Sequence, residues 1–240
     1  MKYPNKLLIL AIFIGQALLL DTFAAQKKWN TAYSNDFKQY DIGDDEPEGL
    51  LILEGNFSVA ETNENKYLGL PGEPLDNFGF LFGPRIPGNL AIQCRFLSEK
   101  KGRRMPTFSL GMGGVTGFRL KVNPSSRKLQ LLREDAVISE ASFQWKSGEW
   151  LTLRLQREQL EDGKKWRISA KAWHGKDEPD DWNILHDSAA KESAGKCSAW
   201  AAPYSSLPIC FDDLKILSTV FAPINPHKNI PIIDFDAKKT

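Results

Sequence analysis

The chain has 240 residues, and its 31 Lys and Arg side chains nearly balance 30 Asp and Glu, so the formal net charge is +1. A chain this close to neutral has no overall electrostatic attraction to nucleic acid or to an anionic membrane, so we expect neither as a partner. The length suits one domain that buries a core of adequate size without the help of disulfide bonds or bound metals.

The first 24 residues have the pattern of a secretory signal peptide. A short basic start precedes an uncharged apolar run at 7–20, which is shorter than the roughly 20 residues that a membrane-spanning helix needs. Small side chains at Thr22 and Ala24 favour cleavage after Ala24. We therefore predict residues 1–24 as a signal peptide and the mature protein as secreted or periplasmic, without membrane contact. An uncleaved membrane anchor is the alternative.

Beyond the signal, apolar and polar residues alternate with period two, and Gly, Pro, Asn and Asp separate the runs. The strands predicted from this pattern are Leu50–Leu53, Phe57–Ala60, Tyr67–Leu70, Gly79–Phe82, Leu90–Leu97, Thr107–Met112, Phe118–Val122, Lys128–Arg133, Trp150–Arg157, Trp166–Trp173 and Cys210–Leu217. Many short strands between turn signals predict an all-β protein, an antiparallel β-sandwich of the jelly-roll type over residues 25–221. Residues 222–240, which contain three prolines, are predicted as an extended tail.

Three cysteines are present in the chain. Alternation places Cys94 on the apolar face of its strand, which predicts an inert core thiol. Cys197 and Cys210 could form a disulfide in an oxidising compartment, or could both stay reduced, because the spacing alone does not fix their geometry.

Alternation also predicts which side chains face away from the core. Leu151, Leu153 and Leu155 set the inner side of one strand, so Arg154 should point outward. If the middle strands share one sheet, its outer face is polar and basic. The candidate ligand-binding residues on that face are Trp173, Trp150, Arg119, Arg154, Arg167 and Lys171.

Two kinds of chemistry make these residues candidates. An exposed indole stacks on a sugar ring, with Trp173 the first candidate and Trp150 the second, whereas arginines bind carboxylate or sulfate groups with two hydrogen bonds. The alternatives are that the tryptophans seal loops at the sheet edge and that the cations have ordinary cross-strand partners. A further basic group, Lys100, Lys101, Arg103 and Arg104, occupies one predicted hairpin loop and is either solvated or in contact with an anionic glycan.

The chain resembles the concanavalin A-like, laminin G-like jelly-roll domains of exported bacterial proteins. The resemblance covers about residues 33–217. The domains that the chain resembles occur in secreted proteins of planctomycetes and verrucomicrobia and are related to the 3-keto-disaccharide hydrolase domain. The motifs that carry the resemblance are Asn35-Asp36-Phe37, 53–59, 65–68, 143–150, 171–175, 178–182 and 211–216. It implies the β-sandwich fold. Domains of this kind include lectins, glycosidases and structural modules, so the resemblance does not indicate one particular function.

The resemblance also implies that the first and last strands lie side by side, which would bring Asp36 near Asp212 and Asp213. Carboxylates from adjacent strands suit calcium, so these three residues are candidates for a structural calcium, and we expect no other cofactor. Ordinary capping of turns and strand ends is the alternative.

No strand carries the alternating carboxylates that glycosidases of this fold class use, and the three histidines have no metal-like spacing. We therefore expect an exported, non-catalytic glycan-binding or assembly module that acts as a monomer, with anionic polysaccharide as its candidate ligand. One alternative is a sugar-processing hydrolase whose candidate groups are Asp177, Glu178 and Asp181. The other is a structural domain whose sheet face binds another exported protein.

Overall fold

The computed structural model describes residues 28–114, 116–189 and 195–219. The predicted signal peptide and the predicted tail lie outside these ranges. Within them, no helix is long and apolar enough to cross a membrane, and the helical content is one 3₁₀ turn, Pro124–Ser126.

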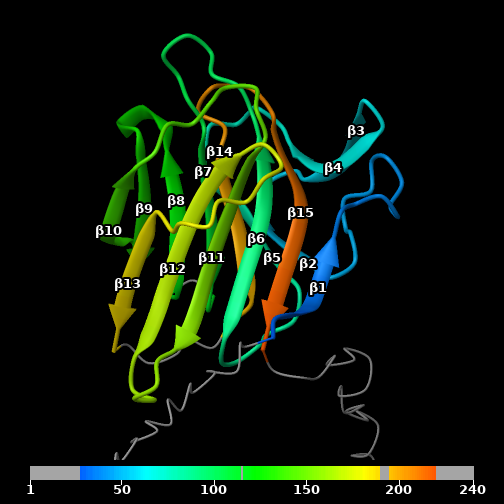
Figure 1. Cartoon of the computed structure of the whole chain (residues 1–240). Coiled ribbons are helices and arrows are strands. Elements are labelled where there is room, and N and C mark those ends of the chain that lie inside the picture. Colours follow the sequence, from blue (N-terminus) through cyan, green and yellow to red (C-terminus); the bar gives the residue numbers. More distant parts are fainter. Residues whose placement is uncertain (1–27, 115, 190–194, 220–240) are drawn as a thin grey trace, which may run out of the picture.

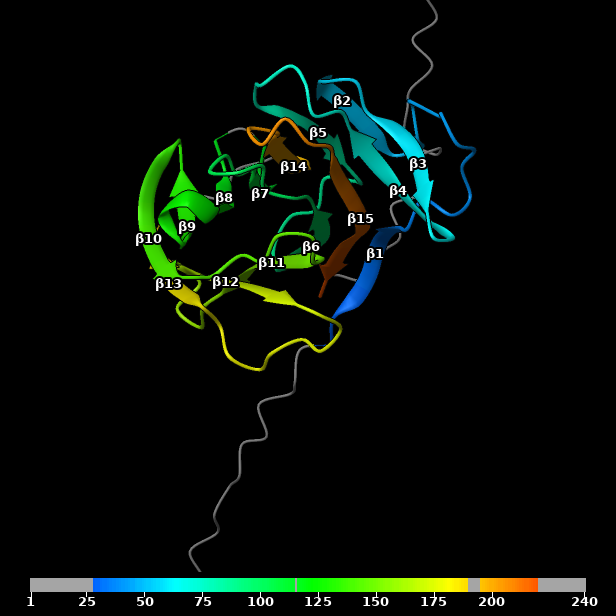
Figure 2. The same ribbon diagram turned by 90° about the horizontal axis from the view of Figure 1, so that it is seen from above.

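Two antiparallel sheets lie face to face (Figures 1 and 2). The first, in spatial order, contains β13 (Ile184–Ser188), β12 (Trp166–His174), β11 (Leu151–Gln159), β6 (Leu90–Leu97), β15 (Ile209–Ser218), β4 (Asn65–Leu70) and β3 (Ser58–Thr62), with β1 (Asn30–Asn35) also paired to β15. The second contains β10 (Ala136–Ser142), β9 (Lys128–Arg133), β8 (Phe118–Asn123), β7 (Thr107–Met112), β14 (Cys197–Ala202), β5 (Phe78–Phe82) and β2 (Leu50–Glu54). This arrangement confirms the predicted antiparallel β-sandwich.

Every predicted strand is present, with its ends displaced by two residues or fewer. The alternation failed to reveal β1, β10, β13 and β14. The clearest reason is at β14, Cys-Ser-Ala-Trp-Ala-Ala, where five of six residues are buried and small side chains occupy both faces, so no period-two pattern forms.

The core between the sheets is built from the inward side of each strand. Phe211 of β15 lies at its centre, with ring centroids 5.6 Å from Phe57, 5.3 Å from Phe80 and 5.2 Å from Phe96. All three contacts are edge-to-face, a geometry that adds about 0.5–1.5 kcal/mol per pair beyond the buried area. Aromatic packing thus joins strands of both sheets at one point.

The last strand, β15, organises the edge of the first sheet. One of its sides pairs with β6, and its other side pairs with β4 near its beginning and with β1 near its end. The pairing of β1 with β15 confirms that the first and last strands are neighbours. The register against β6 slips between Asp212 and Lys215, and Asp213 there has a φ of 48°. This irregularity presents both aspartates toward the outer side of the sheet beside Arg95.

All three thiols are free. Cys197 belongs to the second sheet and Cys210 to the first, so the disulfide considered for this pair is absent. Burial raises the pKa of Cys197 to about 12 and that of Cys210 to about 11, and both stay protonated at neutral pH.

Candidate functional site

The predicted basic face does not exist as one surface. Arg119 lies on β8 in the second sheet, whereas the other predicted cations lie on β11 and β12 in the first. Its Nη2 is 2.7 Å from the carboxylate of Asp135. The prediction that Arg119 shares a face with Arg154 is therefore wrong, because alternation fixes the side of a strand but not the sheet to which the strand belongs.

Arg154, Lys171 and Trp173 are neighbours, but a loop covers them. Arg154 of β11 pairs in register with Lys171 of β12, and the exposed fractions of Lys171 and Trp173 are only 4% and 8%. Glu178 of the loop at 175–183 lies 3.2 Å from Arg154 and 2.8 Å from Lys171. The prediction of an open platform with Trp173 at its edge is therefore wrong. The loop forms ion pairs with both cations through the carboxylate of Glu178.

Arg167 is also paired, at the other end of β12. Its guanidinium nitrogen lies 2.8 Å from Asp187, its cross-strand neighbour on β13, and this hydrogen bond lowers the pKa of the Asp187 carboxyl. The cross-strand partner that was the alternative interpretation is thus present at this position.

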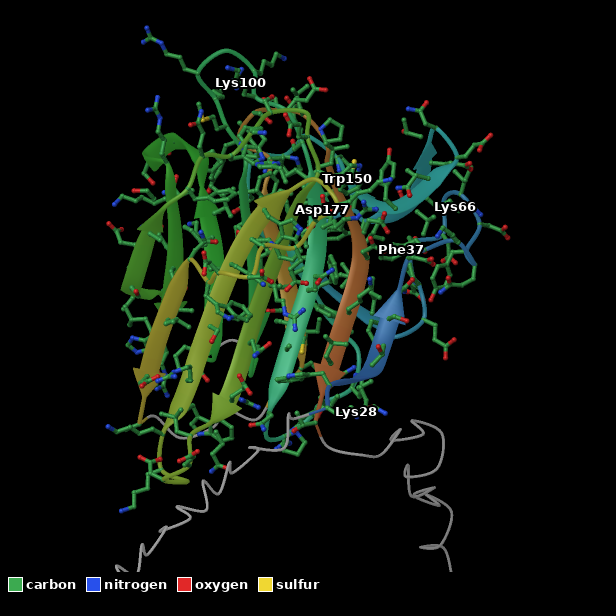
Figure 3. The ribbon with its side chains drawn as sticks, viewed as in Figure 1. Lys28, Phe37, Lys66, Lys100, Trp150 and Asp177 are labelled. Atoms are coloured by element: carbon green, nitrogen blue, oxygen red, sulfur yellow. The ribbon has the colours of Figure 1, made fainter. Side chains whose placement is uncertain are left out.

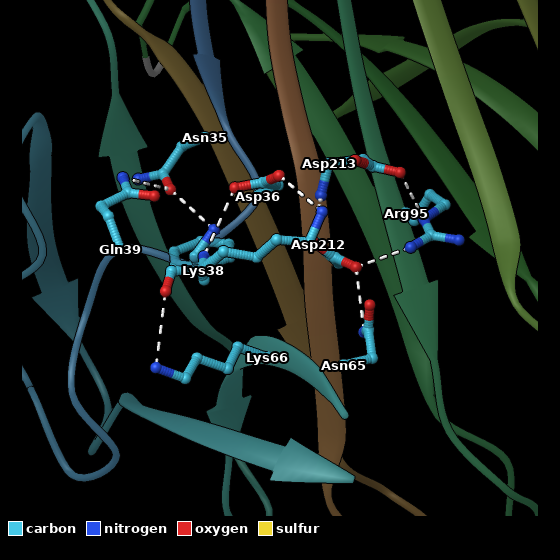
Figure 4. Close-up of polar contacts among 10 residues, drawn as sticks. Asn35, Asp36, Lys38, Gln39, Asn65, Lys66, Arg95, Asp212 and Asp213 are labelled. Carbon is cyan, nitrogen blue, oxygen red and sulfur yellow. Dashed lines mark hydrogen bonds and ion pairs between the residues drawn. The ribbon is translucent and has the colours of Figure 1, made fainter. Parts of the chain in front are cut away.

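Trp150 immediately precedes β11 (Figure 3). The guanidinium carbon of Arg95 is 4.6 Å from the centroid of its ring, a cation–π distance. Arg95 in turn binds both aspartates of the β15 irregularity, at 2.6 Å to Asp212 and 2.8 Å to Asp213 (Figure 4). Trp150 therefore packs on a structural ion-pair cluster.

The three aspartates predicted to bind calcium are near one another but have other partners. Asp212 accepts hydrogen bonds from Arg95 and, at 3.1 Å, from Asn65, and its side chain is 2% exposed. Asp36 lies 2.8 Å from Lys38, whose hydrogen bond lowers the pKa of the Asp36 carboxyl. Among the described residues there is no group of three or more His, Cys, Asp or Glu that could hold a metal ion. These residues therefore do not fit a calcium site in the arrangement seen here.

Sequence reasoning missed a site around Asn35, at the end of β1. The Asn35 side chain is nearly buried, and its Nδ2 donates to the hydroxyls of Tyr33 and Tyr40, both at 3.4 Å. Its Oδ1 accepts from the backbone N–H of Phe37 at 2.9 Å and from Gln39 Nε2 at 3.3 Å. One carboxamide thus orients two tyrosines and a glutamine.

Two hollows meet at this carboxamide. One, of about 340 Å³, is lined by residues that include Tyr33, Asn35, Gln39, Tyr40, Glu48 and Gly49. The other, of about 360 Å³, shares Ser34, Asn35 and Gln39 with the first and extends to Asp36, Asp213 and Lys215. Each is large enough for a single sugar-sized group, and the first combines aromatic, amide and hydroxyl surfaces.

The surrounding loop is held in place by backbone contacts. Lys66 of β4 donates to the carbonyl of Tyr40 at 2.6 Å. It also donates to the carbonyl of Lys38 at 3.4 Å (Figure 4). Gly49 has a φ of +82°, and a Cβ there would lie 3.0 Å from the Tyr33 ring, so only glycine fits without displacement. Burial raises the pKa of Tyr33 to about 12, which keeps its hydroxyl neutral and able to donate.

No protein-family model matches the chain, and no curated protein matches it. Solved structures do resemble its fold. The carbohydrate binding module CBM66 from Bacillus subtilis is 14% identical over 71% of this chain and 96% of its own, with a TM-score of 0.50. The metal-free carbohydrate recognition domain of Emp46p is 13% identical over 79% of this chain and 97% of its own, with a TM-score of 0.56.

Winged bean acidic lectin, solved with methyl-α-D-galactose, is 8% identical over 81% of this chain and 100% of its own, with a TM-score of 0.51. At these identities the likeness concerns the fold alone. The chain therefore has a lectin-type jelly-roll β-sandwich, as the resemblance in its sequence implied.

Proposed function

We propose that this protein is an exported, non-catalytic glycan-binding module whose site is the hollow around Asn35. The observation that carries the proposal is the convergence of the Tyr33 and Tyr40 hydroxyls on the Asn35 carboxamide at a hollow of about 340 Å³. Aromatic faces pack against the C–H surface of a sugar ring, and amides and hydroxyls bind its hydroxyl groups. The carbohydrate-binding neighbours of the same fold support this choice.

Binding without catalysis is proposed because Arg95 neutralises the two adjacent carboxylates beside the site. Both Asp212 and Asp213 lie within 2.8 Å of its guanidinium, so each carboxylate already has a cationic partner. Calcium at Asp36, Asp212 and Asp213 is not part of the proposal, because Lys38 pairs with Asp36 and Arg95 pairs with the other two aspartates. Kinship with the 3-keto-disaccharide hydrolase domains stays a prediction.

The candidate cations of the first sheet do not form a site for an anionic glycan. Arg154 and Lys171 share Glu178, and Arg167 has Asp187, so these cations already have carboxylate partners. The hollow at Asn35 combines uncharged groups with Glu48 and Lys196, of opposite charge. A neutral sugar fits this composition best.

A screen of neutral and acidic oligosaccharides, followed by calorimetry on the binders, tests the proposal. Tyr33→Phe and Tyr40→Phe keep the rings and remove the hydroxyls, and each should weaken binding about fivefold, the effect of one lost hydrogen bond. Tyr67→Phe is the matched control, because the Tyr67 hydroxyl bonds to Thr62 and does not line the hollow. Absence of any glycan binding contradicts the function, and equal affinity in all three variants contradicts the site.

A further inference from the structure

A basic loop lies at the upper end of the sandwich, where Figure 3 labels Lys100. Its cations differ from Arg154, Lys171 and Arg167 of the first sheet, which have carboxylate partners. The basic loop runs from Lys100 to Arg104, and the backbone N–H and C=O groups of Lys101 and Arg104 bond to each other at 3.0 and 3.1 Å. Gly102, with a φ of +61°, makes this tight turn possible. The side chains of Lys100, Lys101 and Arg103 are exposed, and within the described part of the chain none has a carboxylate partner.

A hollow of about 180 Å³ opens beside this loop. Its lining comes from three loops and includes Lys100, Arg127, Gln144, Trp145 and Ser147. Among the described residues no carboxylate contributes to it, so two cations, an amide and a hydroxyl face a space that suits one small group. The nearest acidic residues in sequence, Glu99 and Glu149, do not line it, and Glu149 lies 3.4 Å from Lys146.

Backbone contacts hold the cations in position. Arg127 has a φ of 55°, its N–H donates to the carbonyl of Pro124 at 3.2 Å, and its own carbonyl accepts from Phe143 at 3.0 Å. The N–H of Lys100 donates to Ser147 Oγ at 2.9 Å, which ties the basic loop to the loop after β10. The backbone at both cations is therefore fixed before any ligand arrives, which lowers the cost of binding.

We propose that this hollow binds a sulfate or carboxylate group of an acidic polysaccharide. Lys100 and Arg127 would bind the anionic oxygens, and Gln144 and Ser147 would bind neighbouring sugar hydroxyls. Lys101 and Arg103 strengthen the local positive potential at this end of an otherwise neutral chain. A compact cluster with one small hollow fits a single substituent better than the continuous groove with stacked bases that nucleic acids require. This site is separate from the Asn35 hollow and does not depend on the function proposed there.

Affinity electrophoresis and calorimetry of the intact protein with heparin, polygalacturonate and neutral dextran test the proposal, at about 50 and 200 mM salt. Heparin or polygalacturonate should bind, dextran should not bind at this end, and higher salt should weaken the complex. Arg127→Asn and Lys100→Gln should each weaken it roughly tenfold, the worth of one charged hydrogen bond. Asn tolerates the left-handed backbone at position 127, so the melting temperature of that variant should not fall.

Arg167→Gln is the matched control, because it removes a cation that already has a partner, and it should leave the affinity unchanged. Tyr33→Phe should also leave it unchanged, which separates failure of this site from failure of the Asn35 site. Three results would overturn the proposal: no binding of either acidic polysaccharide, unchanged affinity in both Arg127→Asn and Lys100→Gln, or equally tight binding of duplex DNA or of anionic lipid vesicles. The last result would indicate general attraction to polyanions.

Discussion

The ammonium nitrogen of Lys171 lies 2.8 Å from a carboxylate oxygen of Glu178, on the loop that crosses the outer face of β11 and β12. Lys171 also donates to the carbonyl of Pro179, and its nitrogen is 4.5 Å from the ring centroid of Trp182. One nearly buried cation therefore holds both the charged and the aromatic parts of this loop against the sheet.

Glu178→Ala should destabilise the protein because it leaves Lys171 buried without its counterion. We expect a loss of about 1–3 kcal/mol, less than for a fully buried pair since the Glu178 side chain is 37% exposed. Urea unfolding measures it. Lys171→Met, which removes the charge and keeps the volume, should cost less and should rescue part of the Glu178→Ala loss in the double variant. A Glu178→Ala protein as stable as the wild type would show that the ion pair does not hold the loop.

Removal of Arg95 should be more costly. Arg95→Met leaves the Asp212 carboxylate, 2% exposed, with Asn65 as its remaining side-chain donor, and we expect a loss of about 3 kcal/mol in urea unfolding. Arg167→Met, on the same sheet, breaks an exposed pair and should cost under about 1 kcal/mol. Equal losses in the two variants would contradict the structural role of the Arg95 cluster.

His174 should make stability depend on pH. Its Nε2 accepts from the backbone N–H of Lys146 at 3.2 Å, and its Nδ1 is 3.1 Å from the carbonyl of Trp150, so the folded state requires the neutral ring. Burial lowers the pKa of His174, and the unfolded chain therefore binds the proton more tightly. The stability that His174 contributes should be complete above its ordinary pKa of 6.5 and should decline as the pH falls below it. Unfolding midpoints from pH 8 to about 5 measure this, with His174→Gln as the comparison. An equal decline in the variant would assign the effect to other groups.

Export should be visible at the N-terminus. Mass spectrometry of protein from the native host should give a mature N-terminus at Ala25 or close to it, because small residues at Thr22 and Ala24 suit signal peptidase. A protein that retains Met1 in the cytosol would contradict the proposed location.

The predicted strands were accurate where one face of the strand is buried and the other is polar. Leu151, Leu153 and Leu155 are all fully buried, as alternation required. Alternation also oriented Arg154 and Lys171 away from the core correctly, but it could not show that the loop at 175–183 folds back over them. It likewise could not place Arg119, because strand-to-sheet assignment depends on pairing partners far away in the chain.

The Asn35 hollow was beyond sequence reasoning for a similar reason. Tyr33, Asn35 and Tyr40 are close in sequence, and their polar aromatic character was a usable signal, but Glu48, Gly83 and Lys196 join them only in the folded chain. The basic loop was evident as a run of cations from Lys100 to Arg104, whereas its neighbour Arg127 was not.

The sequence by itself determined the fold class, the positions of most strands and the inward side of those strands, because these follow from a local period of two and from the cost of burying polar groups. Tertiary structure decided which cations pair with carboxylates that are distant in the sequence. Arg154 and Lys171 form ion pairs with Glu178, and Arg95 forms ion pairs with two aspartates. Among the described residues, Lys100 and Arg127 have no carboxylate partner. Charge neutralisation depends on distances between segments remote in sequence, and those distances are set by the sheet pairing and the loops that only the folded chain defines.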